Sequence, residues 1–226
     1  MSTVSPRTLL ILAAAGLAGW WLFGPRDSWR YRMTIEVQTP DGVRTGSAVR
    51  AVTYHRRAGF LLVEGKPTWK VKGQAVAVDL PKGRTLYAVM RANWGDVDYG
   101  ARIAHRTFSE TGHVSGYPGP VELYPTHPDT GFKQTNPVPN LITFADQKDP
   151  TTAESVDPAH LDATFGPGYS LKRITIEVVA RPITDDIRQR LPWLTEIRER
   201  QLDPSGSALN PGVAKRLTHG DFLNRG

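Results

Sequence analysis

The stretch WRYRMTIEVQTPDGVRTGSAVRAVTY, residues 29–54, decides the fold. In its first half apolar side chains alternate with polar ones, so that one face holds Tyr31, Met33, Ile35 and Val37. This period of two predicts a half-buried strand. The sequence Pro40-Asp41-Gly42 predicts a turn, because proline presets φ and glycine accepts a positive φ. The second half returns as a strand, and we predict a β-hairpin in which Gly46 marks a bulge or a close backbone approach.

The strand pattern recurs along the chain. Residues 69–80 and 170–182 alternate in the same way, whereas residues 85–94 are apolar almost throughout and predict a more deeply buried strand. Residues 95–143 are rich in Gly, Pro, Tyr and His, and their weak periodicity predicts long loops with short strands. We therefore expect an α+β fold: a mainly antiparallel β domain, sandwich-like or an open sheet, with short helices.

Residues 184–202 are predicted to be helical. Thr184 can cap this helix, and Pro192 must kink it or begin a second helix. One apolar face holds Ile187, Leu191, Leu194 and Ile197. The expected organisation is thus an N-terminal anchor over residues 1–28, a strand-rich globular domain over residues 29–203 and a loosely structured tail over residues 204–226.

An uncharged apolar segment, TLLILAAAGLAGWWLF, occupies residues 8–23. As a helix it rises about 24 Å, which is short but usable for a bilayer. We predict an uncleaved signal anchor in contact with membrane lipid, because Trp20 to Phe23, the bulkiest residues, follow the small-residue run where a signal peptide would be cut. A cleaved signal peptide is the alternative. Arg26, Arg30 and Arg32 favour a cytoplasmic body by the charge rule, whereas a short signal-like N-terminus favours export.

Composition narrows the remaining possibilities. The net charge is +6, and residues 1–70 hold ten basic but only four acidic side chains. This excess adjoins the apolar segment, so it favours anionic lipid, and we expect no nucleic-acid binding. The chain has no cysteine, which excludes disulfides, thiolate catalysis and cysteine-ligated metals.

The stretch Phe144–Tyr169 crowds acidic residues and one histidine: Asp146, Asp149, Glu154, Asp157, His160 and Asp162. It does not match a calcium-binding loop. We interpret it as a loop and a short helix, in which Asp157 caps, Pro158 begins the helix and Gly166 ends it. A cation shared by the first three acids is the narrower alternative.

No catalytic motif is complete in this chain. Phosphate-loop, nucleotide-binding, serine-elbow and zinc-protease patterns are all missing. The nearest approach to a metal-ligand set is His105, Glu110 and His113. A hydrolase would instead need a second set to converge in one cleft: Asp96, Asp98, His105, His113 and Asp157. Aromatic residues that could bind a sugar or a peptide, or simply fill the core, are Trp69, Trp94, Tyr99, Tyr117 and Tyr124. We assign no catalytic, cofactor-binding or metal-binding residue and expect no cofactor.

Three segments carry a family resemblance: TIEVQTPDGVRTGSAV (residues 34–49), VDLPKGRTLYAVM (residues 78–90) and the block from LITFADQKDP to SLKRITIEV (residues 141–178). The chain resembles a proteobacterial family of membrane-anchored or exported proteins of unknown function, over most of residues 29–200. The resemblance implies a bacterial origin and brings no activity, substrate or site residue with it.

These observations predict a single-pass protein of the bacterial inner membrane with a periplasmic body. We expect that body to be non-enzymatic and to bind an envelope protein or polymer. One alternative is an envelope hydrolase that uses carboxylates or histidines from residues 95–165. Another is a cytoplasm-facing adaptor held at the membrane.

Overall fold

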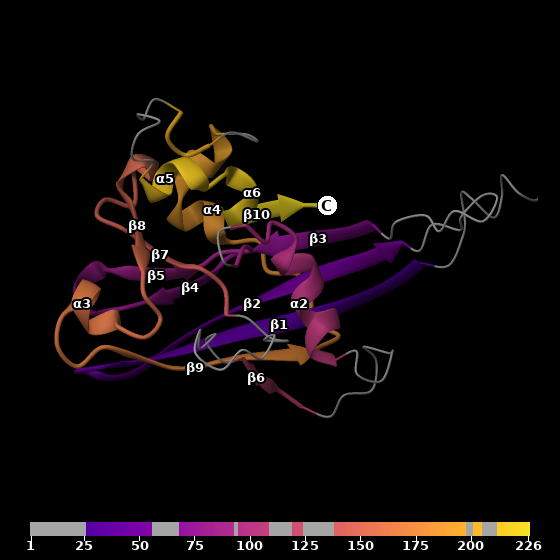
Figure 1. Ribbon diagram of the computed structural model, residues 1–226, viewed down its shortest axis with the longest axis horizontal. Coiled ribbons are helices and arrows are strands. Elements are labelled where there is room, and N and C mark those ends of the chain that lie inside the picture. Colours follow the sequence, from indigo (N-terminus) through magenta and orange to yellow (C-terminus); the bar gives the residue numbers. More distant parts are fainter. Residues whose placement is uncertain are drawn as a thin grey trace, which may run out of the picture.

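The computed structural model describes residues 26–55, 68–92, 95–108, 119–123, 138–197, 201–204 and 212–226. They form two antiparallel sheets and a few short helices (Figure 1). The predicted α+β class with mainly antiparallel strands is therefore confirmed.

The predicted hairpin forms the centre of a six-stranded sheet. β1 (Arg26–Thr39) and β2 (Gly42–His55) pair along their whole length, and Gly42 has a φ of +106° directly after the turn. The predicted inward face of β1 is fully buried. The strand order is β10-β3-β2-β1-β9-β6, in which the added strands are β3 (Thr68–Gln74), β6 (Val121–Leu123), β9 (Ser170–Val178) and β10 (Leu223–Arg225).

A second, four-stranded sheet has the order β4-β5-β7-β8. Its strands are β4 (Val76–Asp79), β5 (Thr85–Ala88), β7 (Leu141–Phe144) and β8 (Ala153–Val156). The strand predicted over residues 69–80 is thus two strands, because the chain leaves the large sheet and enters the small one at Ala75. The short turn η1 (Pro81–Gly83) then joins β4 to β5.

Gly46 lies where the two sheets touch. A Cβ atom at this position would lie 2.0 Å from the backbone oxygen of Ala77 in β4. The pairing of β1 with β2 runs through Gly46 without a shift in register. Gly46 is therefore a close backbone approach and not a bulge, and only glycine fits there without displacing a strand.

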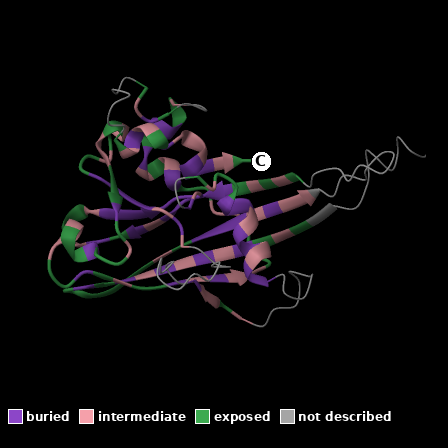
Figure 2. Ribbon diagram, in the orientation of Figure 1, coloured by how far each residue is buried: buried purple, intermediate pink, exposed green. Residues whose placement is uncertain are grey.

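The small sheet lies between two hydrophobic cores. Leu86 and Leu141 face the first core, against β1 and β2 of the large sheet. Tyr87 and Ile142, their neighbours along the strands, face the second core, which the C-terminal elements complete. Figure 2 shows β5 and β7 as buried strands, and all four residues of each are buried. Burial on both faces explains why these strands are apolar runs without alternation.

The predicted helix over residues 184–202 is interrupted. α4 (Ile187–Arg190) ends at Leu191, and Pro192 begins the 3-10 turn η5 (Pro192–Thr195). The apolar face is confirmed, since Ile187, Leu191 and Leu194 are at most 1% exposed. Thr184 does not cap this helix. Its Oγ1 accepts a hydrogen bond from the Val49 backbone N–H at 2.9 Å, so it extends the contact with β2 instead.

The expectation of a loose tail is wrong for residues 212–226. They form α5 (Val213–Arg216), α6 (His219–Phe222) and β10, which pairs with β3. Leu217 and Phe222 are 0% exposed and belong to the second core. Residues 205–211 lie outside the described residues. The C-terminal segment therefore completes the fold by covering the small sheet (Figure 1).

A ten-residue helix, α2 (Tyr99–Phe108), occupies part of the region where loops were expected. It covers the inner face of the large sheet with the buried residues Tyr99, Ile103 and Phe108. No helix in the described part of the chain is long and apolar enough to cross a bilayer. The predicted anchor, residues 8–23, lies outside that part.

Candidate functional site

The acid-rich stretch is held by local capping contacts. Asp149 accepts a hydrogen bond from the Thr151 backbone N–H at 2.9 Å and so caps η4 (Pro150–Thr152). Hydrogen bonds from the Thr151 side chain and backbone lower the pKa of the Asp149 carboxyl. Asp146 accepts from the Lys148 backbone N–H at 2.9 Å. Both carboxylates stabilise turns, as the interpretation by capping predicts.

Asp157 does not cap the short helix in the way predicted. α3 spans Leu161–Phe165 and begins after His160, three residues beyond Asp157. The Asp157 carboxylate instead lies 2.9 Å from His160 Nδ1, within the turn that precedes α3. This hydrogen bond lowers the pKa of Asp157 and raises the pKa of His160. Gly166 ends α3 with a φ of +102°, as predicted.

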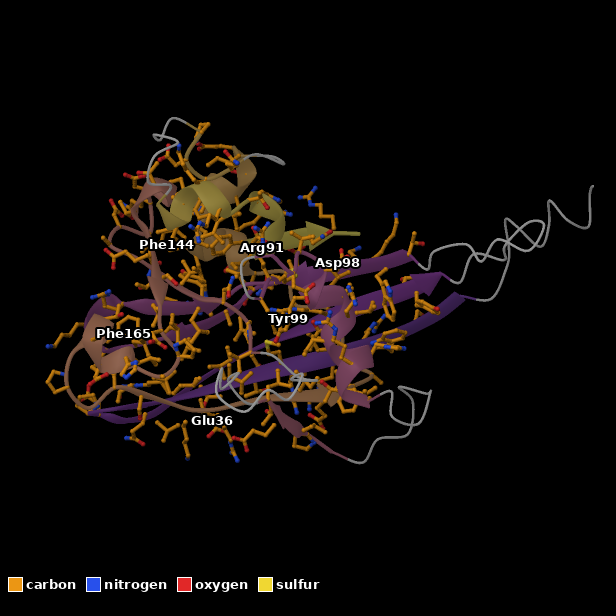
Figure 3. The ribbon with its side chains drawn as sticks, in the orientation of Figure 1. Glu36, Arg91, Asp98, Tyr99, Phe144 and Phe165 are labelled. Carbon is orange, nitrogen blue, oxygen red and sulfur yellow. The ribbon has the colours of Figure 1, made fainter. Side chains whose placement is uncertain are left out.

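The candidate acid–base residues do not converge among the residues that the structure describes. Asp96 is paired with Arg106, whose guanidinium donates at 2.7 Å. Asp98 lies just before α2 and is exposed. Asp157 precedes α3 in the chain, and Figure 3 shows Phe165 of α3 at the left of the molecule and Asp98 to the right of its centre. Within the described ranges no three His, Asp or Glu residues are placed to hold a metal ion. The candidates outside these ranges are Trp94, Glu110, His113, Tyr117 and Tyr124.

An aromatic cluster occupies the end of the large sheet where β1 begins. Trp29 of β1 meets Trp69 of β3 edge to face at 5.9 Å between ring centroids, and Tyr54 of β2 lies 4.5 Å from Trp69. His105 of α2 covers the cluster, 4.8 Å from Trp69. The register places Tyr54 directly opposite Trp69, which explains their contact. Edge-to-face contacts of this kind stabilise beyond the buried area alone.

The aromatic cluster contains two polar groups, the His105 imidazole and the Trp29 indole N–H. Burial, and secondarily the charge of Arg102, lower the pKa of His105, so its imidazole is neutral at pH 7. Trp29 Nε1 is buried without a hydrogen-bond partner among the described residues. A hollow of about 140 Å³ adjoins Trp69 and is lined by Lys70, Val97 and Asp98 among others. Apolar (Val97), cationic (Lys70) and anionic (Asp98) side chains therefore lie around the same hollow.

Basic side chains occupy the opposite face of the same end of the sheet. Arg30 and Lys72 both neighbour Ala51 in one row across β1, β2 and β3, and Lys70 lies in the next row. All three basic side chains are exposed. The end of the sheet where β1 begins thus carries aromatic rings on its inner face and positive charge on its outer face.

A buried arginine lies deeper in the first core. Arg50 is 0% exposed, and its Nε donates to the Gln74 backbone oxygen at 2.8 Å. A second guanidinium nitrogen donates to the Tyr31 hydroxyl at 3.2 Å. None of its hydrogen-bond partners within the described ranges is a carboxylate. Gly73, directly beside Arg50, leaves it room, since a Cβ there would lie 2.8 Å from Arg50 Cγ.

This buried network joins the two sheets. Arg50 belongs to the large sheet, and a third nitrogen lies 3.5 Å from the backbone oxygen of Ala88 in the small sheet. The Tyr31 hydroxyl donates onward to the Gly100 oxygen of α2 at 2.6 Å. Burial raises the pKa of Tyr99 well above its usual range, so it stays neutral beside the guanidinium. We interpret Arg50 as a structural cation that carbonyl and hydroxyl oxygens solvate.

The alternation of residues in β2 indicates that Arg50 is buried, although its charge is typical of an exposed residue. Ala48, Arg50 and Val52 are alternate residues of β2, and the apolar members of this face point into the core. The period of two therefore places Arg50 inward.

Comparison of the chain with protein-family models, curated proteins and solved structures finds no match. The resemblance to a proteobacterial family therefore stays a prediction.

Proposed function

We propose that this chain is a single-pass, membrane-anchored protein whose β-rich domain binds a protein or polymer partner outside the cytoplasm. One observation carries the proposal. The apolar segment 8–23 is joined by only Gly24 and Pro25 to β1, at the sheet end with the aromatic cluster of Trp29, Tyr54 and Trp69.

The chemistry of this end suits a membrane interface. Tryptophan and tyrosine are enriched at bilayer interfaces, and Trp29, Tyr54 and Trp69 are half-buried at this end. Arg30, Lys70 and Lys72 add positive charge, and each cation near an anionic leaflet contributes about 1 kcal/mol of attraction. A strand rises about 3.3 Å per residue, so Arg30 lies only about 13 Å along β1 from Arg26.

A binding role agrees with the state of the candidate catalytic groups. Asp96 is paired with Arg106, Asp149 caps a turn and Asp157 contacts His160. The hollow beside Trp69 instead offers an aromatic ring, Lys70 and Asp98 on an exposed edge. Val97 at this hollow is 63% exposed and is therefore accessible to a partner.

Membrane association is tested by fractionating cells that express the full chain, followed by an alkaline carbonate wash. We expect the protein in the washed membrane pellet. The double variant Leu10→Arg/Leu12→Arg should move to the soluble fraction, because each charge costs about 2.5–3.5 kcal/mol in an inserted helix. Val43→Arg, at an exposed position in β2, is the control and should stay in the pellet. A soluble full-length wild-type protein, or a shortened mature chain in the soluble fraction, overturns the anchor.

Orientation needs a separate experiment, because Arg26, Arg30 and Arg32 follow the apolar segment whereas only Arg7 precedes it. That charge distribution favours the second candidate, a cytoplasm-facing adaptor. Two C-terminal reporters distinguish the two, one active only outside the cytoplasm and one active only inside. We expect activity from the outside reporter alone, and activity from the inside reporter alone replaces the first candidate with the second.

Partner binding is tested with a photo-crosslinking residue at position 97 in intact cells. The matched control is position 43, where the native valine is also exposed, at 43%. We expect a discrete adduct with a protein or polymer from position 97 only. Equal labelling at both positions, or lipid adducts alone, overturns the partner-binding proposal without affecting the anchor.

A further inference from the structure

A cavity of about 530 Å³ lies among the C-terminal elements. Its walls come from α4, η5, α6 and β10. The volume is in the range of small-molecule sites, roughly 300–1,000 Å³. Leu194 and Leu223, which are 1% and 3% exposed, lie beneath the lining and present almost no surface to the cavity.

The polar part of the lining is basic or neutral. Three residues that can carry positive charge contribute to it: Arg188, His219 and Arg225. Neutral hydrogen-bonding groups come from Thr195, Thr218 and Asn224. Among the lining residues that the structure describes there is no Asp or Glu. The ionisable residues of the described lining therefore carry one sign of charge.

Asp221, which lies between the lining residues of α6 and β10, is already engaged. Asp221 in α6 is 4% exposed and accepts a hydrogen bond from Arg91 Nε at 2.9 Å. It also accepts from the Thr218 backbone N–H at 2.7 Å as part of a capping box. Neither Arg188 nor Arg225 forms an ion pair with any residue in the described ranges. Their charges are thus left for a ligand.

Tertiary packing creates this arrangement. Arg188 follows Ile187, which is buried in the second core, and Arg225 lies at the end of β10, which is paired with β3. Two arginines thus line one cavity that has no carboxylate among its described lining residues. A cleft lined by one sign of charge raises the local concentration of opposite charge.

We propose that this cavity binds a small molecule that carries a phosphate or carboxylate group. Guanidinium groups match both oxyanions with paired N–H donors. The side-chain amide of Asn224, whose Oδ1 accepts from the Gly226 backbone N–H, has an NH2 group that can donate a further hydrogen bond to the anion. The inference does not depend on the membrane anchor.

Titration calorimetry of the full chain in a non-ionic detergent tests the proposal, with phenyl phosphate, benzoate, phenol and benzylammonium as probes. We expect phenyl phosphate or benzoate to bind with a Kd below about 1 mM, and phenol and benzylammonium not to bind. Arg188→Gln and Arg225→Gln should each weaken binding about tenfold, since each removes a charge-assisted hydrogen bond. Arg44→Gln, which removes one exposed charge near the hairpin turn, is the matched control and should bind like wild type.

Each variant is first melted to confirm a Tm within about 2 °C of wild type, a shift of about 1 kcal/mol or less. The proposal is overturned if neither anion binds at 10 mM probe, on the order of the weakest measurable affinities. It is also overturned if phenol binds as tightly as phenyl phosphate, or if Arg44→Gln weakens binding as much as Arg188→Gln.

Discussion

Replacing Gly46 by alanine tests the packing of the two sheets directly. The added Cβ would lie 2.0 Å from the Ala77 oxygen and 2.8 Å from its carbonyl carbon. Normal contacts begin at about 3.5 Å, so the sheets must separate by on the order of 1 Å or more at this point. Gly46 belongs to β2 and Ala77 belongs to β4, and each strand is held by pairing with a neighbour. The Ala77 atoms are backbone atoms, so no side-chain rotation relieves the contact.

The expected cost is at the upper end of overpacking, about 3 kcal/mol or more. For a domain of this size each kcal/mol lowers Tm by about 2–4 °C, so Gly46→Ala should melt about 6–12 °C below wild type. Thermal unfolding of the full chain in detergent, followed by circular dichroism, measures this shift.

Gly212→Ala is the matched control. A Cβ at Gly212 meets nothing within 4 Å, and its φ of −52° suits any residue. We expect a change below about 1 kcal/mol for this variant. If Gly46→Ala melts within about 2 °C of wild type, the sheets do not meet at Gly46 and the packing described above is wrong.

Three further outcomes are expected. Arg50→Lys should lower the free energy of unfolding, measured by urea denaturation, by about 2–4 kcal/mol, because one ammonium cannot reach all the oxygens that the guanidinium joins. The control Arg173→Lys, at an exposed position, should change it by less than about 0.5 kcal/mol. Equal effects of the two variants would refute the role of Arg50. Phe222→Ala should lower the free energy of unfolding by about 3–5 kcal/mol, since this ring is fully buried against Tyr87, Phe144 and Trp193. A loss below about 0.5 kcal/mol would mean that the C-terminal segment is loosely packed after all. Hydrogen bonding to Arg173 lowers the pKa of Glu36 in the folded protein. The ionised Glu36 carboxylate therefore stabilises the folded state at pH values above its unfolded pKa of about 4.3, and this stabilisation is lost as the pH falls through the folded pKa. Glu36→Gln should therefore be less stable than wild type at pH 6 and equal to it well below the folded pKa, and a pH-independent difference would contradict this linkage.

Local periodicity predicted the parts of the fold that depend on neighbouring residues. Alternation in β1, the turn at Pro40-Asp41 and the stop at Gly166 were all found where expected. Each depends on the φ preference of one residue or on the period of two along one strand, and both are properties of the local chain. The capping by Asp149 is of the same kind, because its partner Thr151 is two residues away.

Contacts between distant segments decided the remainder. The run over residues 85–94 indicated burial, but its two cores depend on a C-terminal segment that the sequence alone suggested was loose. The same packing brings Arg188 and Arg225 to one cavity, and it places Phe165 of α3 apart from Asp98 (Figure 3). Composition describes which residues can be buried or charged. Which of these residues come into contact depends on the free energy of burying apolar surface between strands that are far apart in sequence. This contribution arises only when the chain folds and the strands pack together.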